Sequence, residues 1–190
     1  GALAQMLEQT LWGELDYLII DMPPGTGDIQ LTLTQKAKVS GAVIVTTPQD
    51  IALLDARKGI EMFRKVDVPV LGIIENMAVH VCSQCGHHEH IFGEHGGDRI
   101  ASDYGVPLLA SLPLQLSIRV QSDAGRPSVV AEPDSDVTKC YLKAATAVRQ
   151  ALAGQGIHVA HLAAVDERQA LELGLQQGSG HERAPTRAGR

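Results

Sequence analysis

Short, continuously apolar runs alternate along the chain with longer segments of helical spacing, and this alternation restricts the possible folds strongly. Four runs have the character of strands, at residues 15–20, 41–47, 70–74 and 107–112. The helical segments cover residues 2–12, 29–38, 50–66, 97–104, 115–122 and 135–152. Strands that are apolar throughout are typical of a parallel sheet with helices on both faces. The sequence therefore predicts an α/β fold with a doubly wound, mostly parallel sheet.

The segment 50–66 shows the helical pattern in detail. Asp50 is suited to cap the start of the helix, because its side chain can accept a hydrogen bond from a free backbone N–H. Ile51, Leu54, Ile60 and Phe63 are expected near one face, which would turn toward the sheet.

Composition and charge exclude several classes of protein. The chain has 190 residues, with 16 basic and 22 acidic side chains, so it lacks the basic surplus that nucleic-acid binding requires. Its apolar runs are far shorter than the ~20 residues of a membrane span. The N-terminus has no secretory-signal pattern. We expect a cytoplasmic protein whose partners include neither nucleic acid nor a membrane.

The composition changes after Ala153. Residues 157–175 are compatible with a helix, whereas residues 176–190 are polar, glycine-rich and charged, which is typical of disorder. We therefore expect a domain over residues 1–153. A C-terminal extension over residues 154–190 would be partly helical and then disordered.

The motif DMPPGTGD, residues 21–28, follows the first predicted strand. A carboxylate at the end of a buried strand is costly unless it faces a cation or hydrogen-bond donors. The loop after it can bring backbone N–H groups against a phosphate. This pattern is typical of the Walker B aspartate and switch loop of a P-loop NTPase. An aspartate that caps a tight Pro-Pro-Gly turn explains it equally well.

Glu75-Asn76-Met77 follows the third predicted strand. The amide of Asn76 presents one donor and one acceptor, which match the N6/N7 edge of adenine. An asparagine at a strand end is more commonly a simple turn residue. In open parallel sheets, ligands bind beyond the carboxyl ends of the strands. Unusual residues gather at those ends here, which favours one shared site.

Two of the three cysteines, Cys82 and Cys85, form a CxxC motif, and Cys140 stands alone in a helical segment as an ordinary packed or half-exposed thiol. Two thiolates at this spacing can hold one metal atom, and Gly86 allows a sharp turn behind them. Three alternatives are open: zinc completed by histidines, a dithiol redox pair, and a cluster completed by another chain. The nearby histidines are His80, His87, His88 and His90.

Taken in order, these motifs resemble the Mrp family of iron–sulfur cluster carrier ATPases, in the MinD/ParA-like branch of P-loop NTPases. The resemblance covers roughly residues 3–152, and DMPPGTGD followed by ENM and CxxCG is far more specific than any one motif. It favours the cluster among the three alternatives. The segments that carry it are LDYLIIDMPPGTGDIQLTL (15–33), VTTPQDIALLDARKGIEMF (45–63), VPVLGIIENM (68–77), CSQCG (82–86), IFGEHGG (91–97), VPLLASLPL (106–114) and SDAGRPSVV (122–130).

The resemblance implies a nucleotide site. Asp21 corresponds to the Walker B aspartate that supports Mg²⁺ through water, and Gly25 corresponds to the switch glycine near the γ-phosphate. Asn76 corresponds to the asparagine that contacts adenine, and Pro113 with its neighbours lines the base pocket. In the complete family protein, ATP binding and hydrolysis would be coupled to loading or release of the cluster.

The resemblance also implies that Cys82 and Cys85 are ligands of a 4Fe-4S cluster. Such a cluster takes four thiolate-type ligands, and each chain offers two, so a homodimer bridged by the cluster is expected. Its partners would be iron–sulfur apoprotein clients. The alternative function is a non-catalytic zinc-binding interaction module that uses Cys82, Cys85 and nearby histidines.

One departure from the family pattern affects these expectations. The phosphate loop of the GKGGVGKS type is not found in the chain, and no GxxxxGK[ST] occurs. Its lysines and Mg²⁺-binding hydroxyl are missing with it, as are the first strand of the sheet and the aspartate that orients the attacking water. We therefore expect an N-terminally truncated domain with exposed strand edges and no ATPase activity by itself.

Overall fold

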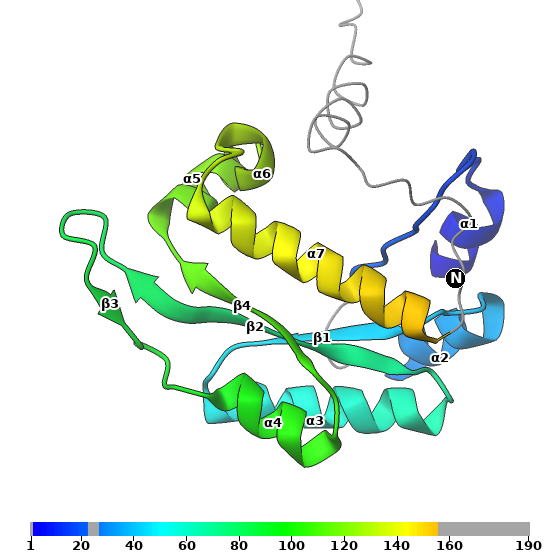
Figure 1. The fold of residues 1–190 in the computed structure, drawn as a ribbon. Coiled ribbons are helices and arrows are strands. Elements are labelled where there is room, and N and C mark those ends of the chain that lie inside the picture. Colours follow the sequence, from blue (N-terminus) through cyan, green and yellow to red (C-terminus); the bar gives the residue numbers. More distant parts are fainter. Residues whose placement is uncertain (1, 23–26, 156–190) are drawn as a thin grey trace, which may run out of the picture. The chain divides into compact units, whose positions relative to one another are not determined.

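A four-stranded sheet forms the centre of the computed structural model, which describes residues 2–22 and 27–155 (Figure 1). β2 (Val70–Val81) lies in the middle, with β1 (Ala42–Thr46) and β4 (Leu108–Leu114) parallel to it on opposite edges. The two-residue β3 (His88–Glu89) pairs antiparallel with the end of β2. His80 of β2 pairs with β4 on one edge and with β3 on the other. β3 therefore lies on the same edge of β2 as β1.

Helices cover both faces of this sheet. α3 (Asp50–Lys65) and α4 (Gly96–Tyr104) pack on one face, and α7 (Asp136–Gly154) packs on the other (Figure 1). The remaining described helices are α1 (Ala2–Gln9), α2 (Gly27–Lys36), α5 (Leu116–Asp123) and α6 (Ser128–Ala131). The predicted α/β fold with a mostly parallel sheet is confirmed. None of the helices in the described ranges is long and apolar enough to cross a membrane.

Neighbouring residues of β2 pack into two different hydrophobic clusters, because successive strand side chains point to opposite faces of the sheet. Ile73 packs with Ile60 of α3 and Ile100 of α4, and all three are fully buried. Ile74 packs against a second cluster that includes Ala144 of α7. Burial on both faces explains why this strand is a continuous apolar run.

The core face of α3 differs in part from the expected one. Ile60 and Phe63 are buried as predicted, but Ile51 and Leu54 are 74% and 58% exposed. Nine residues separate Ile51 from Ile60, which places them on opposite sides of a helix with 3.6 residues per turn. The residues of α3 that are buried are Leu53, Ala56, Ile60 and Phe63.

The strand predicted at residues 15–20 is wrong. The chain has no regular secondary structure there, and the apolar side chains before Ile20 are exposed, with Ile19 90% exposed. A strand forms only when its backbone pairs with a neighbour. Among the described residues, β1 pairs with β2 alone, and no strand pairs with residues 15–20.

Candidate functional site

The CxxC motif forms the turn of the hairpin between β2 and β3. The backbone N–H of Cys82 donates to the carbonyl of His87, and the N–H of Gly86 donates to the carbonyl of Cys82, both at 2.9 Å. Gly86 has φ = +70°, in the left-handed region that glycine adopts without strain. Cys82 and Cys85 therefore lie on one hydrogen-bonded turn at the end of the sheet (Figure 1).

The two thiols of this turn are not joined in a disulfide, and both are at least partly exposed. Cys85 is exposed and Cys82 is half-buried. Hydrogen bonds from the backbone of Gln84, then from the backbone and side chain of Cys85, lower the pKa of the Cys82 thiol. A lowered pKa favours the thiolate, which is the form that binds metals and acts as a nucleophile.

Cys140 lies in a different environment. It belongs to α7, is half-buried, and packs against the cluster formed by Ala110, Leu112 and Ala144. This agrees with the expectation of an ordinary packed thiol outside the CxxC turn.

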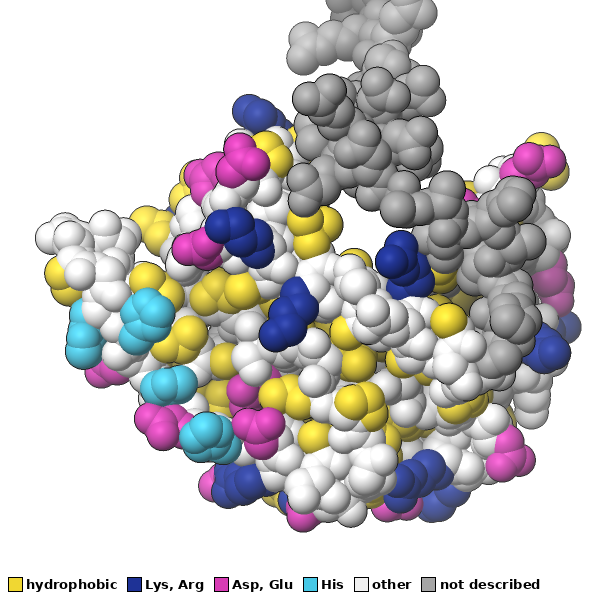
Figure 2. All heavy atoms as spheres, viewed as in Figure 1, with side chains coloured by type: hydrophobic (Ala, Val, Ile, Leu, Met, Phe, Trp, Pro, Cys, Tyr) yellow, Lys and Arg dark blue, Asp and Glu magenta, His cyan; other side chains and the backbone are white. Residues whose placement is uncertain are grey.

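Histidine side chains gather on the surface at the hairpin end of the sheet (Figure 2). The Nδ1 atom of His90 lies 2.9 Å from the carbonyl oxygen of Ala78, and that of His80 lies 3.2 Å from the carbonyl oxygen of Leu114. A carbonyl only accepts, so each Nδ1 donates and is not free as a ligand. Within the described ranges, no three Cys, His, Asp or Glu side chains form a group that could hold a metal ion.

Asn76 lies on a bulge in β2 rather than after the strand. Glu75 pairs with Ser111 of β4, and Val79 pairs with Pro113, so three residues of β2 are opposite one residue of β4. Met77 has φ = +56°, which is uncommon for a residue other than glycine. The side-chain oxygen of Asn76 accepts a 2.9 Å hydrogen bond from the N–H of Met77. The structure therefore brings Asn76 and Pro113 onto neighbouring strands at this bulge.

Glu75 is buried, and sequence reasoning named it only as part of the Glu75-Asn76-Met77 motif, with no role of its own. Its side chain is 4% exposed, and its Oε1 accepts a 2.8 Å hydrogen bond from the N–H of Gly97, in the first turn of α4. The free N–H groups of a helix N-terminus stabilise a carboxylate. Its position beside Asn76 was the only signal in the sequence that pointed to this residue.

Of the two candidate site residues in the DMPPGTGD motif, Asp21 and Gly25, the structure describes Asp21 alone. Asp21 is exposed and follows the irregular segment 15–20, so it does not end a buried strand. Gly25 lies outside the described residues. The expected helix 157–175 and the rest of the extension beyond residue 155 lie outside them as well.

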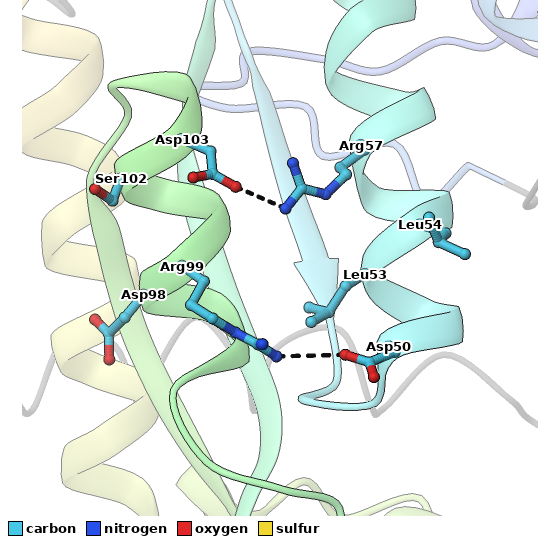
Figure 3. A pocket seen from close by; sticks show the side chains of 8 residues that line it. All are labelled: Asp50, Leu53, Leu54, Arg57, Asp98, Arg99, Ser102 and Asp103. Atoms are coloured by element: carbon cyan, nitrogen blue, oxygen red, sulfur yellow. Dashed lines mark hydrogen bonds and ion pairs between the residues drawn. The ribbon is translucent and has the colours of Figure 1, made fainter.

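An open groove of about 610 Å³ lies between α3 and α4 (Figure 3). Arg57 contacts Asp103 at 2.6 Å, and Arg99 contacts Asp50 at 3.4 Å, so these charges satisfy one another across the groove. The residues that line it are Asp50, Leu53, Leu54, Arg57, Asp98, Arg99, Ser102 and Asp103. Nothing in this lining indicates a particular ligand.

Solved structures of two nucleotide-bound proteins are among those that resemble this fold. A nucleotide-binding protein from Archaeoglobus fulgidus, in complex with ADP, is 42% identical, with a TM-score of 0.61 over 72% of this chain and 55% of that one. The septum site-determining protein MinD from Pyrococcus horikoshii, complexed with Mg-ADP, is 26% identical, with a TM-score of 0.61 over 84% and 59%. The fold is therefore that of the MinD/ParA-like P-loop NTPases.

A sequence model of the ParA group, described as NUBPL iron-transfer P-loop NTPase, matches residues 1–149, and the chain belongs to this family. It is 66% identical over 141 residues to the iron–sulfur cluster carrier protein of Pseudomonas fragi, covering 74% of this chain and 49% of that protein. It is 54% identical over 148 residues to the mouse iron–sulfur cluster transfer protein NUBPL, covering 78% and 46%. The chain thus spans about half the length of these relatives.

Proposed function

We propose that this chain carries an iron–sulfur cluster on the thiolates of Cys82 and Cys85 and transfers it to apoprotein clients. The observation that carries the proposal is the hairpin turn, which holds both thiols on one hydrogen-bonded loop at the end of the sheet. The lowered pKa of Cys82 favours the thiolate that iron binds. Relatives named as cluster carrier and cluster transfer proteins support this assignment.

The cargo is a 4Fe-4S cluster shared between two copies of the chain. Such a cluster takes four ligands of the thiolate type, and the turn supplies two. A two-fold axis through the cluster gives both copies the same surface and the same ligands. The exposed position of Cys85 leaves room for the second copy to approach.

In the complete protein, this transfer is coupled to binding and hydrolysis of ATP with Mg²⁺. Asp21 is an exposed carboxylate, which suits a water-mediated contact with Mg²⁺, and Gly25 lies in the same motif. We assign Asn76 and Pro113, which lie on the paired strands β2 and β4, to the lining of the base pocket. When bound, Mg²⁺ neutralises charge on the phosphates during transfer of the γ-phosphoryl group to water.

One strand links the two parts of this proposed mechanism. Asn76 and Cys82 belong to β2 and the turn that follows it, six residues apart along the chain. A displacement of β2 at the base pocket would therefore be transmitted directly to the cluster ligands. We place the nucleotide-binding domain at residues 1–153, a boundary one residue before the end of α7 at Gly154, and assign no role to the extension over residues 154–190. We place the protein in the cytoplasm.

Anaerobic reconstitution of the full chain with iron and sulfide tests the proposal. We expect the charge-transfer absorbance of a 4Fe-4S cluster, bound iron, and a shift to the dimer on size exclusion. Cys82→Ala and Cys85→Ala should abolish all three signals, whereas the matched control Cys140→Ala should retain them. About one zinc per chain, lost on replacing His87, His88 or His90, would instead support the zinc-binding module and reject cluster carriage.

A further inference from the structure

The CxxC turn holds its two cysteines three residues apart on one hydrogen-bonded loop. Cys82 and Cys85 are the first and fourth residues of a turn that the Gly86 N–H closes onto the Cys82 carbonyl at 2.9 Å. This bond joins the fifth residue of the turn to the first, as in one turn of an α-helix, where Cα atoms three residues apart lie about 5 Å from each other. The Cα atoms of a disulfide are usually about 4.4–6.8 Å apart. The two sulfurs can therefore approach without displacement of the strands.

Both arms of the hairpin are held in place on either side of the turn. His80 pairs with Glu89, and Val81 pairs with His88, in the β2–β3 ladder. On its other edge, His80 also pairs with Leu114 of β4. Because this framework already closes the loop between the two cysteines, joining their sulfurs costs little additional chain entropy.

The accessibility of the two thiols sets their order of reaction. Cys85 is exposed, so it is the sulfur that a small disulfide in solution reaches first, while Cys82 is half-buried beside it. The chain has three cysteines, and the third, Cys140, packs against α7 and β4 residues away from this turn. An intramolecular bond at the turn therefore involves Cys82 and Cys85 alone.

We propose that Cys82 and Cys85 form a reversible dithiol–disulfide pair, whose oxidised form prevents the chain from taking up a cluster. The second part rests on the proposed function, since it treats the same sulfurs as cluster ligands. A sulfur in a disulfide is no longer a thiolate and cannot ligate iron. Cluster uptake is then restricted to the reduced chain.

The oxidant is a low-molecular-weight disulfide such as oxidised glutathione. The Cys85 thiolate attacks one of its sulfurs, forming a mixed disulfide and releasing one glutathione thiolate. The Cys82 thiolate then attacks the Cys85 sulfur, forming the Cys82–Cys85 bond and releasing the second glutathione. Two protein thiols lose two protons and two electrons, and one disulfide gains them as two glutathione thiols.

The test uses the full chain with the substitution Cys140→Ser. This change removes the third cysteine, so that Cys82 and Cys85 are the two thiols that remain. The chain is incubated with oxidised glutathione without oxygen, and free thiols and intact mass are measured. We expect both thiols to disappear, a mass loss of two hydrogens with no glutathione retained, and recovery of both thiols with dithiothreitol. The added substitution Cys82→Ser or Cys85→Ser should stop the reaction at a glutathione adduct.

The outcomes separate the redox pair from the proposed function. Stable glutathione adducts, or disulfides only between chains, would overturn the dithiol pair. Reduced and oxidised samples are then offered iron and sulfide, and uptake by the reduced sample alone is expected. Equal uptake by both overturns the block on loading. Uptake by neither, with the intramolecular disulfide formed, rejects cluster carriage and leaves the redox pair supported by the thiol count.

Discussion

The buried carboxylate of Glu75 accepts a 2.8 Å hydrogen bond from the backbone N–H of Gly97. This contact fixes the first turn of α4 to β2 immediately before the bulge at Asn76 and Met77. Glu75, the residue before the proposed adenine contact Asn76, is thereby bonded to α4 on one face of the sheet. The position of Asn76 depends on this bond as well as on the pairing of β2 with β4.

Removing the acceptor should therefore destabilise the domain. Glu75→Ala leaves the Gly97 N–H without its partner and opens a cavity, at a cost of about 2–4 kcal/mol in the free energy of unfolding. Glu75→Gln keeps a carbonyl acceptor and should cost about 1 kcal/mol. Urea unfolding followed by circular dichroism measures both. Glu61→Ala, at an exposed position of α3, serves as the control, and equal effects of the two alanine variants would contradict this role.

Gly97 should tolerate no side chain. A Cβ added there would lie 3.0 Å from the Cβ of Glu75 and 3.0 Å from Cδ1 of Leu108, closer than most real contacts. Gly97→Ala should therefore destabilise the domain by about 1–3 kcal/mol through overpacking. Gly154→Ala is the matched control, because Gly154 is also helical and, among the described residues outside its own helical turn, no atom lies within 4 Å of its added Cβ. Thermal unfolding should separate the two variants, and a neutral Gly97→Ala would contradict the packing described.

The sequence predicted strands correctly where an apolar run also has a neighbouring strand with which to pair. The runs at 41–47, 70–74 and 107–112 became β1, β2 and β4 because each pairs with a neighbour. The run at 15–20 has the same pattern but no described neighbour, and pattern alone does not supply hydrogen-bond partners. The residue types of a segment indicate only its preference for the strand conformation, whereas a strand forms only if another strand lies beside it.

The site was predictable where the motif itself determines the local geometry. The glycine after CxxC predicted the sharp turn, and Gly86 has the expected positive φ. The polar residues of Glu75-Asn76-Met77 resembled the end of a strand, but β2 continues to Val81 because a bulge at Met77 absorbs the interruption. The bond from Gly97 to Glu75 joins residues 22 positions apart, which no local pattern reveals.

The lowered pKa of Cys82 should be visible in its reactivity with iodoacetamide. Because hydrogen bonds from Gln84 and Cys85 stabilise the thiolate, a larger fraction of Cys82 is ionised below its ordinary pKa. Alkylation should decline only as the pH falls through the lowered value, so the profile is displaced to lower pH. Site-resolved mass spectrometry of the folded chain, compared with a free peptide of residues 80–88, measures this. Coinciding profiles for chain and peptide would show that the turn does not stabilise the thiolate.

The chain should show no ATPase activity by itself. No GxxxxGK[ST] loop occurs in the sequence, so no phosphate-loop lysine meets the charge that develops on the γ-phosphoryl group. Phosphate release from Mg-ATP should stay at the level of a blank. Turnover that Asp21→Ala abolishes would mean that other residues of the chain form a phosphate-binding loop.

The open edge of β1 should make the chain prone to association. Among the described residues β1 pairs only with β2, and Val45 on this edge strand is 61% exposed. An unpaired edge accepts strands from other molecules, and a lysine there opposes such pairing. Val45→Lys should therefore lower the concentration-dependent light scattering of the metal-free, reduced chain. The control Ile51→Lys removes a comparably exposed apolar side chain from a helix and should lower the light scattering less. An equal reduction by Val45→Lys and Ile51→Lys would show that surface hydrophobicity, and not the strand edge, causes the association.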